Sequence, residues 1–101
     1  EGKAAKKKVS YNIQSSTVRS AVSSEIDLRG MESIEAVNAA EMYIDNAVMA
    51  KLSTVTIIHG KGTGTLRAAI HQMLKRNKAV KSFRLGRYGE GETGVTIVEL
   101  K

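Results

Sequence analysis

The stretch TVTIIHG, residues 54–60, constrains the fold of this chain more than any other. Its residues are β-branched or apolar on both faces of an extended backbone, a pattern typical of a parallel strand buried under helices. Parallel strands need long crossover connections, which are usually helices. A segment with helical periodicity lies on each side of this strand, which indicates that strands and helices alternate along this part of the chain.

The first helix is expected at residues 33–51, with Ser33 able to cap its start. Apolar residues recur there at helical spacing: Val37, Ala40, Ile44, Ala47 and Val48. A second helix is expected at TLRAAIHQMLKR, residues 65–76, where apolar residues again fall on one side. Asn77 should end it in a left-handed conformation.

Shorter segments predict the remaining strands. In EIDLRG, residues 25–30, apolar and charged residues alternate, which indicates a short strand with one buried face. VKSFRLG and GVTIVEL, residues 80–86 and 94–100, predict two strands joined by a glycine-rich loop. A short strand near residues 9–13 is also conceivable.

The predicted order is β-α-β-α-β-β, an α/β fold of the α+β two-layer type. Right-handed crossovers should place both helices on one face of a four-stranded mixed sheet. Residues 1–24 hold five basic side chains and one acidic, with no core-forming pattern, so they are expected to be a basic, flexible linker. Residues 25–101 should form one domain.

Charge is unevenly distributed along the domain. Residues 25–45 carry six acids and one base, whereas residues 46–89 carry nine Lys or Arg and no acid. So long a stretch of one sign favours a polyanionic partner, although a solvated basic surface is the plainer alternative. The absence of cysteine excludes disulfides and thiol nucleophiles. With no apolar run of membrane-spanning length and no visible signal peptide, we expect a cytoplasmic protein without a membrane partner.

The glycine loop HGKGTG, residues 59–64, fits neither the P-loop nor the dinucleotide-binding fingerprint. The loop nevertheless favours phosphate as a ligand, because glycines let the backbone approach an anion and a helix amino terminus offers free N–H groups. The residues predicted to bind phosphate or nucleic acid are Gly60, Lys61, Gly62, Thr63, Gly64 and Arg67. The structural alternative is a turn that needs positive φ at one of the glycines.

Three side chains are predicted to act in catalysis: Asp27, Arg29 and His59. They follow two strands expected to be parallel neighbours, so they should meet at the sheet edge where α/β proteins bind ligands. His59 can serve as general acid or base, Asp27 can orient it or accept a proton, and Arg29 can hold phosphate. Such a set suits phosphodiester cleavage.

Structural alternatives exist for these residues. Asp27 can pair with Arg29 or cap the first helix, and His59 can hydrogen-bond the loop. His71, on the flank of the second helix, is expected to be exposed without a role. Asp27 and His59 would supply only two metal ligands, so no protein-built metal site and no required cofactor are predicted, and dependence on a divalent ion stays open.

Two motifs together resemble a known family. DLRG at 27–30 and HGKGTG at 59–64, within a β-α-β frame, are similar to the Smr (small MutS-related) domain. The similarity spans residues 25–100, includes the closing SFRLGRYGEGETGVTIVEL, and is greatest to the Smr domain at the carboxyl terminus of bacterial MutS-two proteins.

This resemblance implies a fold like the C-terminal domain of translation initiation factor three. It implies nucleic-acid binding, and in several members endonuclease activity that nicks DNA, with branched DNA, RNA and the ribosome as partners and links to repair and recombination. A non-catalytic DNA-, RNA- or ribosome-binding module is the alternative, and a protein-interaction domain is a third. The implied parent chain carries a MutS-like ATPase and dimerises, and this fragment is expected to be monomeric.

Overall fold

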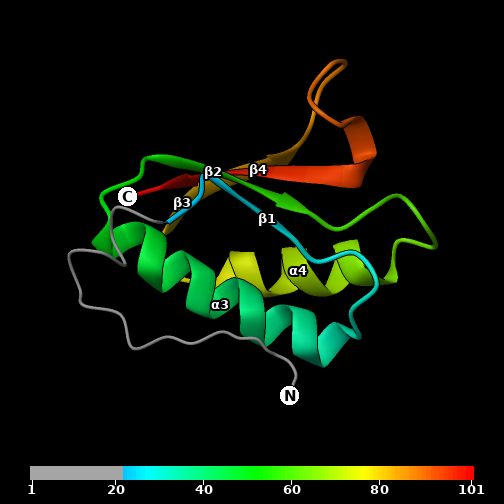
Figure 1. The fold of residues 1–101 in the computed structure, drawn as a ribbon, viewed down its shortest axis with the longest axis horizontal. Helices are drawn as coiled ribbons and strands as arrows, with labels where there is room; N and C mark the ends of the chain where they lie inside the picture. Colours follow the sequence, from blue (N-terminus) through cyan, green and yellow to red (C-terminus); the bar gives the residue numbers. More distant parts are fainter. Residues whose placement is uncertain (1–21) are drawn as a thin grey trace.

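The computed structural model describes residues 22–101, which form two helices packed on one face of a sheet (Figure 1). The predicted strand at residues 9–13 and nearly all of the predicted linker lie outside these residues. The predicted order β-α-β-α-β-β is confirmed. In chain order the elements are β1 (Glu25–Asp27), α3 (Ser33–Met49), β2 (Thr54–Ile58), α4 (Thr65–Arg76), β3 (Val80–Leu85), the 3₁₀ turn η1 (Glu92–Gly94) and β4 (Val95–Leu100).

The four-stranded sheet has the order β1-β2-β4-β3. β1 and β2 are parallel, with Asp27 opposite Ile58, and β4 runs antiparallel to both β2 and β3. The carboxyl ends of β1 and β2 therefore lie at the same edge of the sheet as the amino end of β4. This register places the segments that follow Asp27 and Ile58 side by side, as the sequence predicted.

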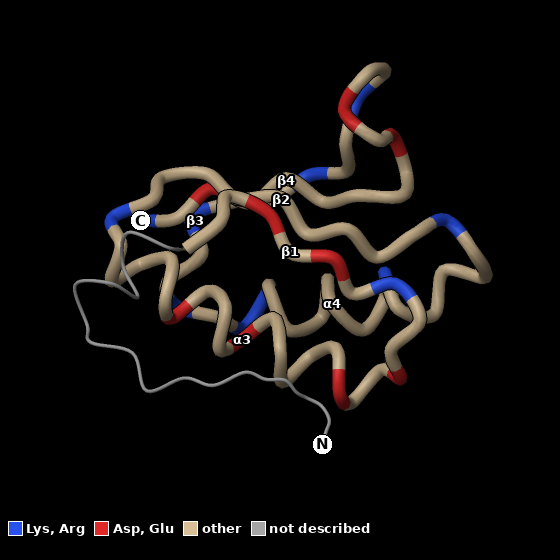
Figure 2. Tube along the Cα trace, viewed as in Figure 1, with Lys and Arg blue, Asp and Glu red and all other residues tan. Residues whose placement is uncertain are grey.

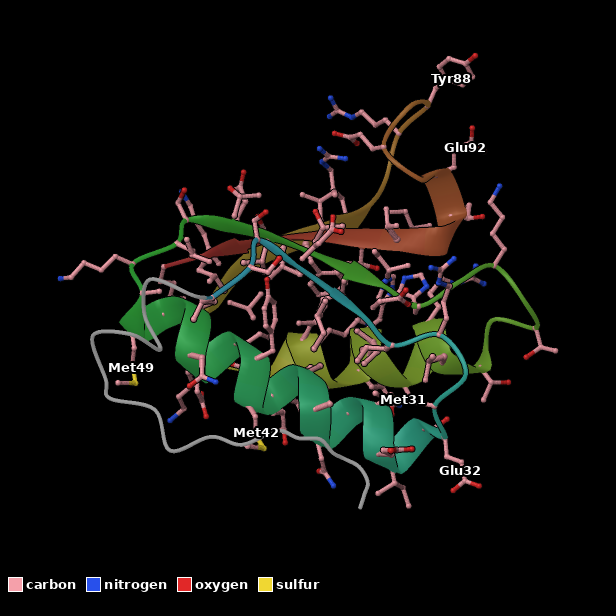
Figure 3. All side chains as sticks on the ribbon, in the orientation of Figure 1. Met31, Glu32, Met42, Met49, Tyr88 and Glu92 are labelled. Carbon is pink, nitrogen blue, oxygen red and sulfur yellow. The ribbon has the colours of Figure 1, made fainter. Side chains whose placement is uncertain are left out.

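The core lies between the helices and the inner face of the sheet. Its fully buried apolar side chains include Leu28, Ala36, Ala40, Ile44, Ala47, Val55, Ile57, Ile70 and Val98. Alanines at three of the α3 core positions let this helix approach the sheet closely. Met42 and Met49 project from the outer side of α3 and are exposed (Figure 3).

β2 is buried on one face only, which corrects the expectation of burial on both. Val55 and Ile57 are buried beneath the helices, whereas Thr56 and Ile58 on the other face are half-buried. The reason is topological, since both helices cover the same face. In the described part of the chain, neither helix is long and apolar enough to cross a bilayer.

Several predicted helix details were wrong. Ser33 is the first residue of α3 and makes no side-chain cap, and the helix ends at Met49, before Lys51 turns left-handed with φ of 63°. Val48 is 40% exposed and does not belong to the core face. Asn77 is extended rather than left-handed, and its side-chain oxygen accepts the N–H of Ala79.

Candidate functional site

The glycine loop connects β2 to α4 and has positive φ at all three glycines: 83° at Gly60, 22° at Gly62 and 86° at Gly64. Two of them also admit a close contact. A Cβ on Gly60 would lie 3.3 Å from Cγ of Arg29, and one on Gly64 would lie 2.8 Å from Nη2 of Arg67. Gly60 and Gly64 therefore each meet two requirements: a left-handed backbone conformation and close approach by an arginine side chain.

A cleft of about 420 Å³ lies beside this loop. Its walls are residues 30–33, which lead into α3, and residues 59–67, which lead into α4. The amino termini of both helices border it, and such termini carry partial positive charge and unpaired N–H groups. Among the lining residues, Glu32 is the acid, and its side chain projects outward from the start of α3 (Figure 3).

Charge around the cleft follows the segregation seen in the sequence. Figure 2 shows the connection between β2 and α4 with basic but no acidic residues, while acidic residues occur on β1 and along α3. Within residues 22–101, no group of three or more His, Asp or Glu side chains is placed to hold a metal ion.

A second hollow, of about 450 Å³, lies on the other side of the loop. Arg29, Gly60 and Lys61 line it together with η1 and the start of β4. The Nζ of Lys61 lies 3.3 Å from an oxygen of Glu92, which projects from η1 (Figure 3). Lys61 is therefore already paired with a carboxylate, and an anionic ligand would compete with Glu92 for it.

Asp27 and Arg29 pair with each other, as one of the alternatives anticipated. The Nε of Arg29 donates to Oδ1 of Asp27 at 2.9 Å and its Nη2 to Oδ2 at 2.6 Å. These bonds lower the pKa of Asp27 to about 2. Among the hydrogen bonds of the described residues, none joins Asp27 to His59, so Asp27 does not orient the imidazole.

His59 is held by the loop and by β4. It is only 5% exposed; its Nδ1 lies 3.0 Å from the carbonyl oxygen of Gly60, and its Nε2 lies 2.8 Å from Oγ1 of Thr96. Burial lowers the pKa of His59, and the nearby charge of Arg67 lowers it further. The imidazole is therefore neutral at pH 7 and fixed in orientation.

Thr63 organises the loop itself. Its hydroxyl lies 2.9 Å from that of Thr65 and accepts the Thr65 N–H at 3.3 Å. Both contacts tie the loop to the first turn of α4.

The sequence interpretation missed Thr96 and misjudged His71. His71 is half-buried, not exposed; its Nε2 lies 2.7 Å from Oγ1 of Thr96, and its ring packs on Phe83 at 4.9 Å. Thr96 occupies an inward position of β4, two residues before buried Val98. A threonine in line with buried apolar residues was the available signal, but only the fold shows which side chains it meets.

The fold and the cleft define a small α+β domain with an electropositive glycine loop at a strand–helix junction. The Smr domain family matches residues 26–101, and the chain belongs to this family. The predicted resemblance is confirmed.

Relatives of known name support the same assignment. The chain is 58% identical over 96 residues to "Endonuclease MutS2" of Clostridium novyi, covering 95% of this chain and 12% of that protein. It is 64% identical over 80 residues to "Endonuclease MutS2" of Clostridium tetani, covering 79% and 10%. The chain thus spans about a tenth of the length of these relatives.

Two solved structures share the fold. The Smr domain of Thermus thermophilus MutS2 superposes with a TM-score of 0.75 at 45% identity, covering 76% of this chain and 96% of that one. YdaL, a stand-alone small MutS-related protein from Escherichia coli, superposes with a TM-score of 0.73 over 77% of this chain and 64% of its own. At 23% identity, this second likeness concerns the fold alone.

Proposed function

We propose that this domain binds nucleic acid at the cleft beside the glycine loop and cleaves a phosphodiester there, nicking DNA. The observation that carries the proposal is the convergence at one cleft of two helix amino termini, Lys61, Arg67 and a buried, neutral His59. The names of the MutS2 relatives, which are called endonucleases, support the same chemistry.

Phosphate binding in this proposal falls to Arg67, Lys61 and the amides that open α4. A phosphodiester carries one negative charge and accepts several hydrogen bonds, which cations and helix-terminal N–H groups satisfy together. Arg29, whose stem lies against Gly60, lines the second hollow and would neutralise charge that develops during cleavage from that side of the loop. Asp27 would hold the Arg29 guanidinium in place.

His59 would donate a hydrogen bond from its ring N–H to the reacting phosphate and so stabilise the charge that develops as the P–O bond breaks. Removing one preorganised donor of this kind typically costs about 10²–10³-fold in kcat. Because the pKa of His59 is lowered, the ring is neutral at pH 7, a state in which one nitrogen can donate and the other accept.

The wider biology is proposed for the whole protein. It comprises action on branched DNA, control of repair and recombination, contact with RNA or the ribosome, a dimeric parent chain with a MutS-like ATPase, and residence in the bacterial cytosol.

A non-catalytic binding module is the second candidate, and one observation favours it. Both ring nitrogens of His59 are bonded within the protein, and the Asp27 carboxylate is engaged by Arg29. In that case the cleft would bind phosphate without breaking a bond.

The binding half of the proposal is tested with Arg67→Ala against Arg76→Ala. Both remove one arginine from α4, but Arg76 lies in the last turn, away from the cleft. Arg67→Ala should weaken DNA and RNA binding and reduce its salt dependence, whereas Arg76→Ala should have a smaller effect. Equal losses would move the binding surface away from the cleft.

The catalytic half is tested by nicking of supercoiled plasmid, with and without Mg²⁺ or Mn²⁺. His59→Gln keeps an amide that can bond to Thr96 but loses the ring N–H beside the cleft. Nicking lost in this variant with binding retained supports the endonuclease. A wild-type chain that binds DNA but nicks it under none of these conditions supports the binding module.

A further inference from the structure

The hydroxyl of Thr96 lies between two histidine rings. Its Oγ1 is 2.8 Å from Nε2 of His59 and 2.7 Å from Nε2 of His71. The three residues come from three places, namely the loop after β2, the middle of α4 and the start of β4. Thr96 is fully buried, so water does not satisfy its hydroxyl. Every proton in this group must therefore be placed among these side chains.

The contact of His59 with Gly60 decides where the protons lie. A carbonyl oxygen only accepts, so Nδ1 of His59, 3.0 Å from it, carries the hydrogen. The neutral ring then has a lone pair on Nε2, which accepts the hydroxyl proton of Thr96. That hydroxyl has no second proton, so Nε2 of His71 must donate to it. With both rings neutral, this is the arrangement that satisfies all three contacts.

The packing of His71 adds to this restraint. Its ring meets that of His59 edge-on, with centroids 6.0 Å apart and planes at 81°, and it also packs on the ring of Phe83 on β3. Burial disfavours a charged imidazole in both rings, and the positive charge of Arg67 acts in the same sense on both, as that of Lys75 does on His71. The rings of His59 and His71 are therefore both neutral near pH 7.

We propose that Thr96 and His71 are positioning residues that fix the ring orientation of His59 and hold it as the Nδ1–H tautomer. Since Nε2 points to buried Thr96, Nδ1 is the edge beside the loop residues that line the cleft. That edge is a hydrogen-bond donor. This inference rests on the proposed function in one respect: a phosphate oxygen, which only accepts, would replace the Gly60 carbonyl as its partner.

The tautomer is measured directly by long-range ¹H–¹⁵N NMR of the histidine rings at about pH 8, above the ordinary histidine pKa. We expect His59 to be protonated on Nδ1 and His71 on Nε2. Thr96→Val keeps the shape but removes the hydroxyl that anchors Nε2, so the ring can rotate away from the Gly60 carbonyl and a mixture of His59 tautomers should appear. Thr96→Ser should restore the wild-type spectrum. His59 protonated on Nε2 in the wild type, or unchanged in Thr96→Val, would overturn the inference.

Two further variants distinguish a positioning role of His71 from simple filling of space. His71→Gln retains an N–H donor for Thr96 and should keep the His59 tautomer. His71→Leu has no donor, so the hydroxyl can turn and the minor tautomer of His59 should increase. If His71→Leu gives the wild-type spectrum, His71 only fills space.

Kinetics then connect the tautomer to the reaction. In the nicking assay, Thr96→Val should lower kcat at least about tenfold with KM little changed, because the donor is no longer held in place, and Thr96→Ser should recover it. An unchanged kcat in Thr96→Val would overturn the positioning role. If the wild-type chain does not nick, the proposed cleavage fails, while the NMR result still decides whether Thr96 and His71 fix the tautomer.

Discussion

Gly64→Ala should disturb the backbone and the position of Arg67 together. The φ of Gly64 is 86°, in the left-handed region, where a residue with a Cβ costs about 1–2 kcal/mol. The new Cβ would lie 2.8 Å from Nη2 of Arg67 and 3.4 Å from its Cζ. Since the guanidinium ends a flexible side chain, it should move away from the loop while the backbone stays.

Gly89→Ala is the matched control. Gly89 has φ of 88°, but a Cβ there meets nothing within 4 Å. Both variants should lose about 1–2 kcal/mol of stability, which lowers Tm by about 4–16 °C in a domain of this size. Only Gly64→Ala should also lose affinity for nucleic acid. A charge-assisted phosphate contact that is partly open to solvent contributes about 1–2 kcal/mol, so the loss should be about 5–30-fold.

The assay is fluorescence anisotropy with labelled DNA over a series of salt concentrations. Loss of one phosphate contact should reduce the slope of log K against log salt by about 0.7–0.9. In an Arg67→Ala background, Gly64→Ala should cause no further loss of affinity, because the contact is already absent. If Gly64→Ala melts like Gly89→Ala but binds DNA with wild-type affinity and slope, Arg67 does not hold phosphate from this position.

Three further outcomes are expected. Glu92→Gln releases Lys61 from its carboxylate partner and should tighten DNA binding up to about fivefold at low salt, because exposed ion pairs contribute about 0–1 kcal/mol. Glu41→Gln makes the same charge change on α3, and an equal gain in affinity there would mean that net charge alone is responsible. Thr96→Val leaves two buried ring nitrogens without a partner and should cost about 2–4 kcal/mol in denaturant unfolding, against about 1 kcal/mol for Thr96→Ser, which loses a methyl group. Burial lowers the pKa of His59 and His71, so the unfolded chain takes up more protons in acid than the folded chain does. The free energy of unfolding should therefore be highest above about pH 7 and fall as the pH drops through about 6.5, and a Tm that rises on acidification would contradict this.

The fold could be predicted because its signals are local. Alternation, helical spacing and glycine positions each depend on neighbouring residues, and they located both helices and all four strands of the described domain, although not the 3₁₀ turn η1. The predicted helix ends were less accurate, because local signals alone do not determine where a helix stops. Ser33 and Asn77 have side chains suited to helix caps, but Ser33 lies inside the helix and Asn77 is extended, because tertiary packing determines their backbone conformations.

The site was predictable as a location rather than as a set of contacts. Parallel strands bring their carboxyl ends together, which placed Asp27 and His59 at one edge. The partners of His59 could not be predicted, because Thr96 lies 37 residues further along the chain and reaches it only through the antiparallel pairing of β4 with β2. The same holds for Glu92, 31 residues from Lys61.

The internal partners of the predicted phosphate-binding groups imply an order of importance among them. Arg29 donates to a carboxylate of Asp27, Lys61 to one of Glu92, and each must exchange that oxygen for one of the phosphate. Among the hydrogen bonds and ion pairs of residues 22–101, none engages the side chain of Arg67, which lies over Gly64 at the start of α4. A phosphate contact by Arg67 therefore displaces no carboxylate of residues 22–101. Its removal should weaken binding more than removal of Lys61, although Lys61 is the more exposed of the two cations.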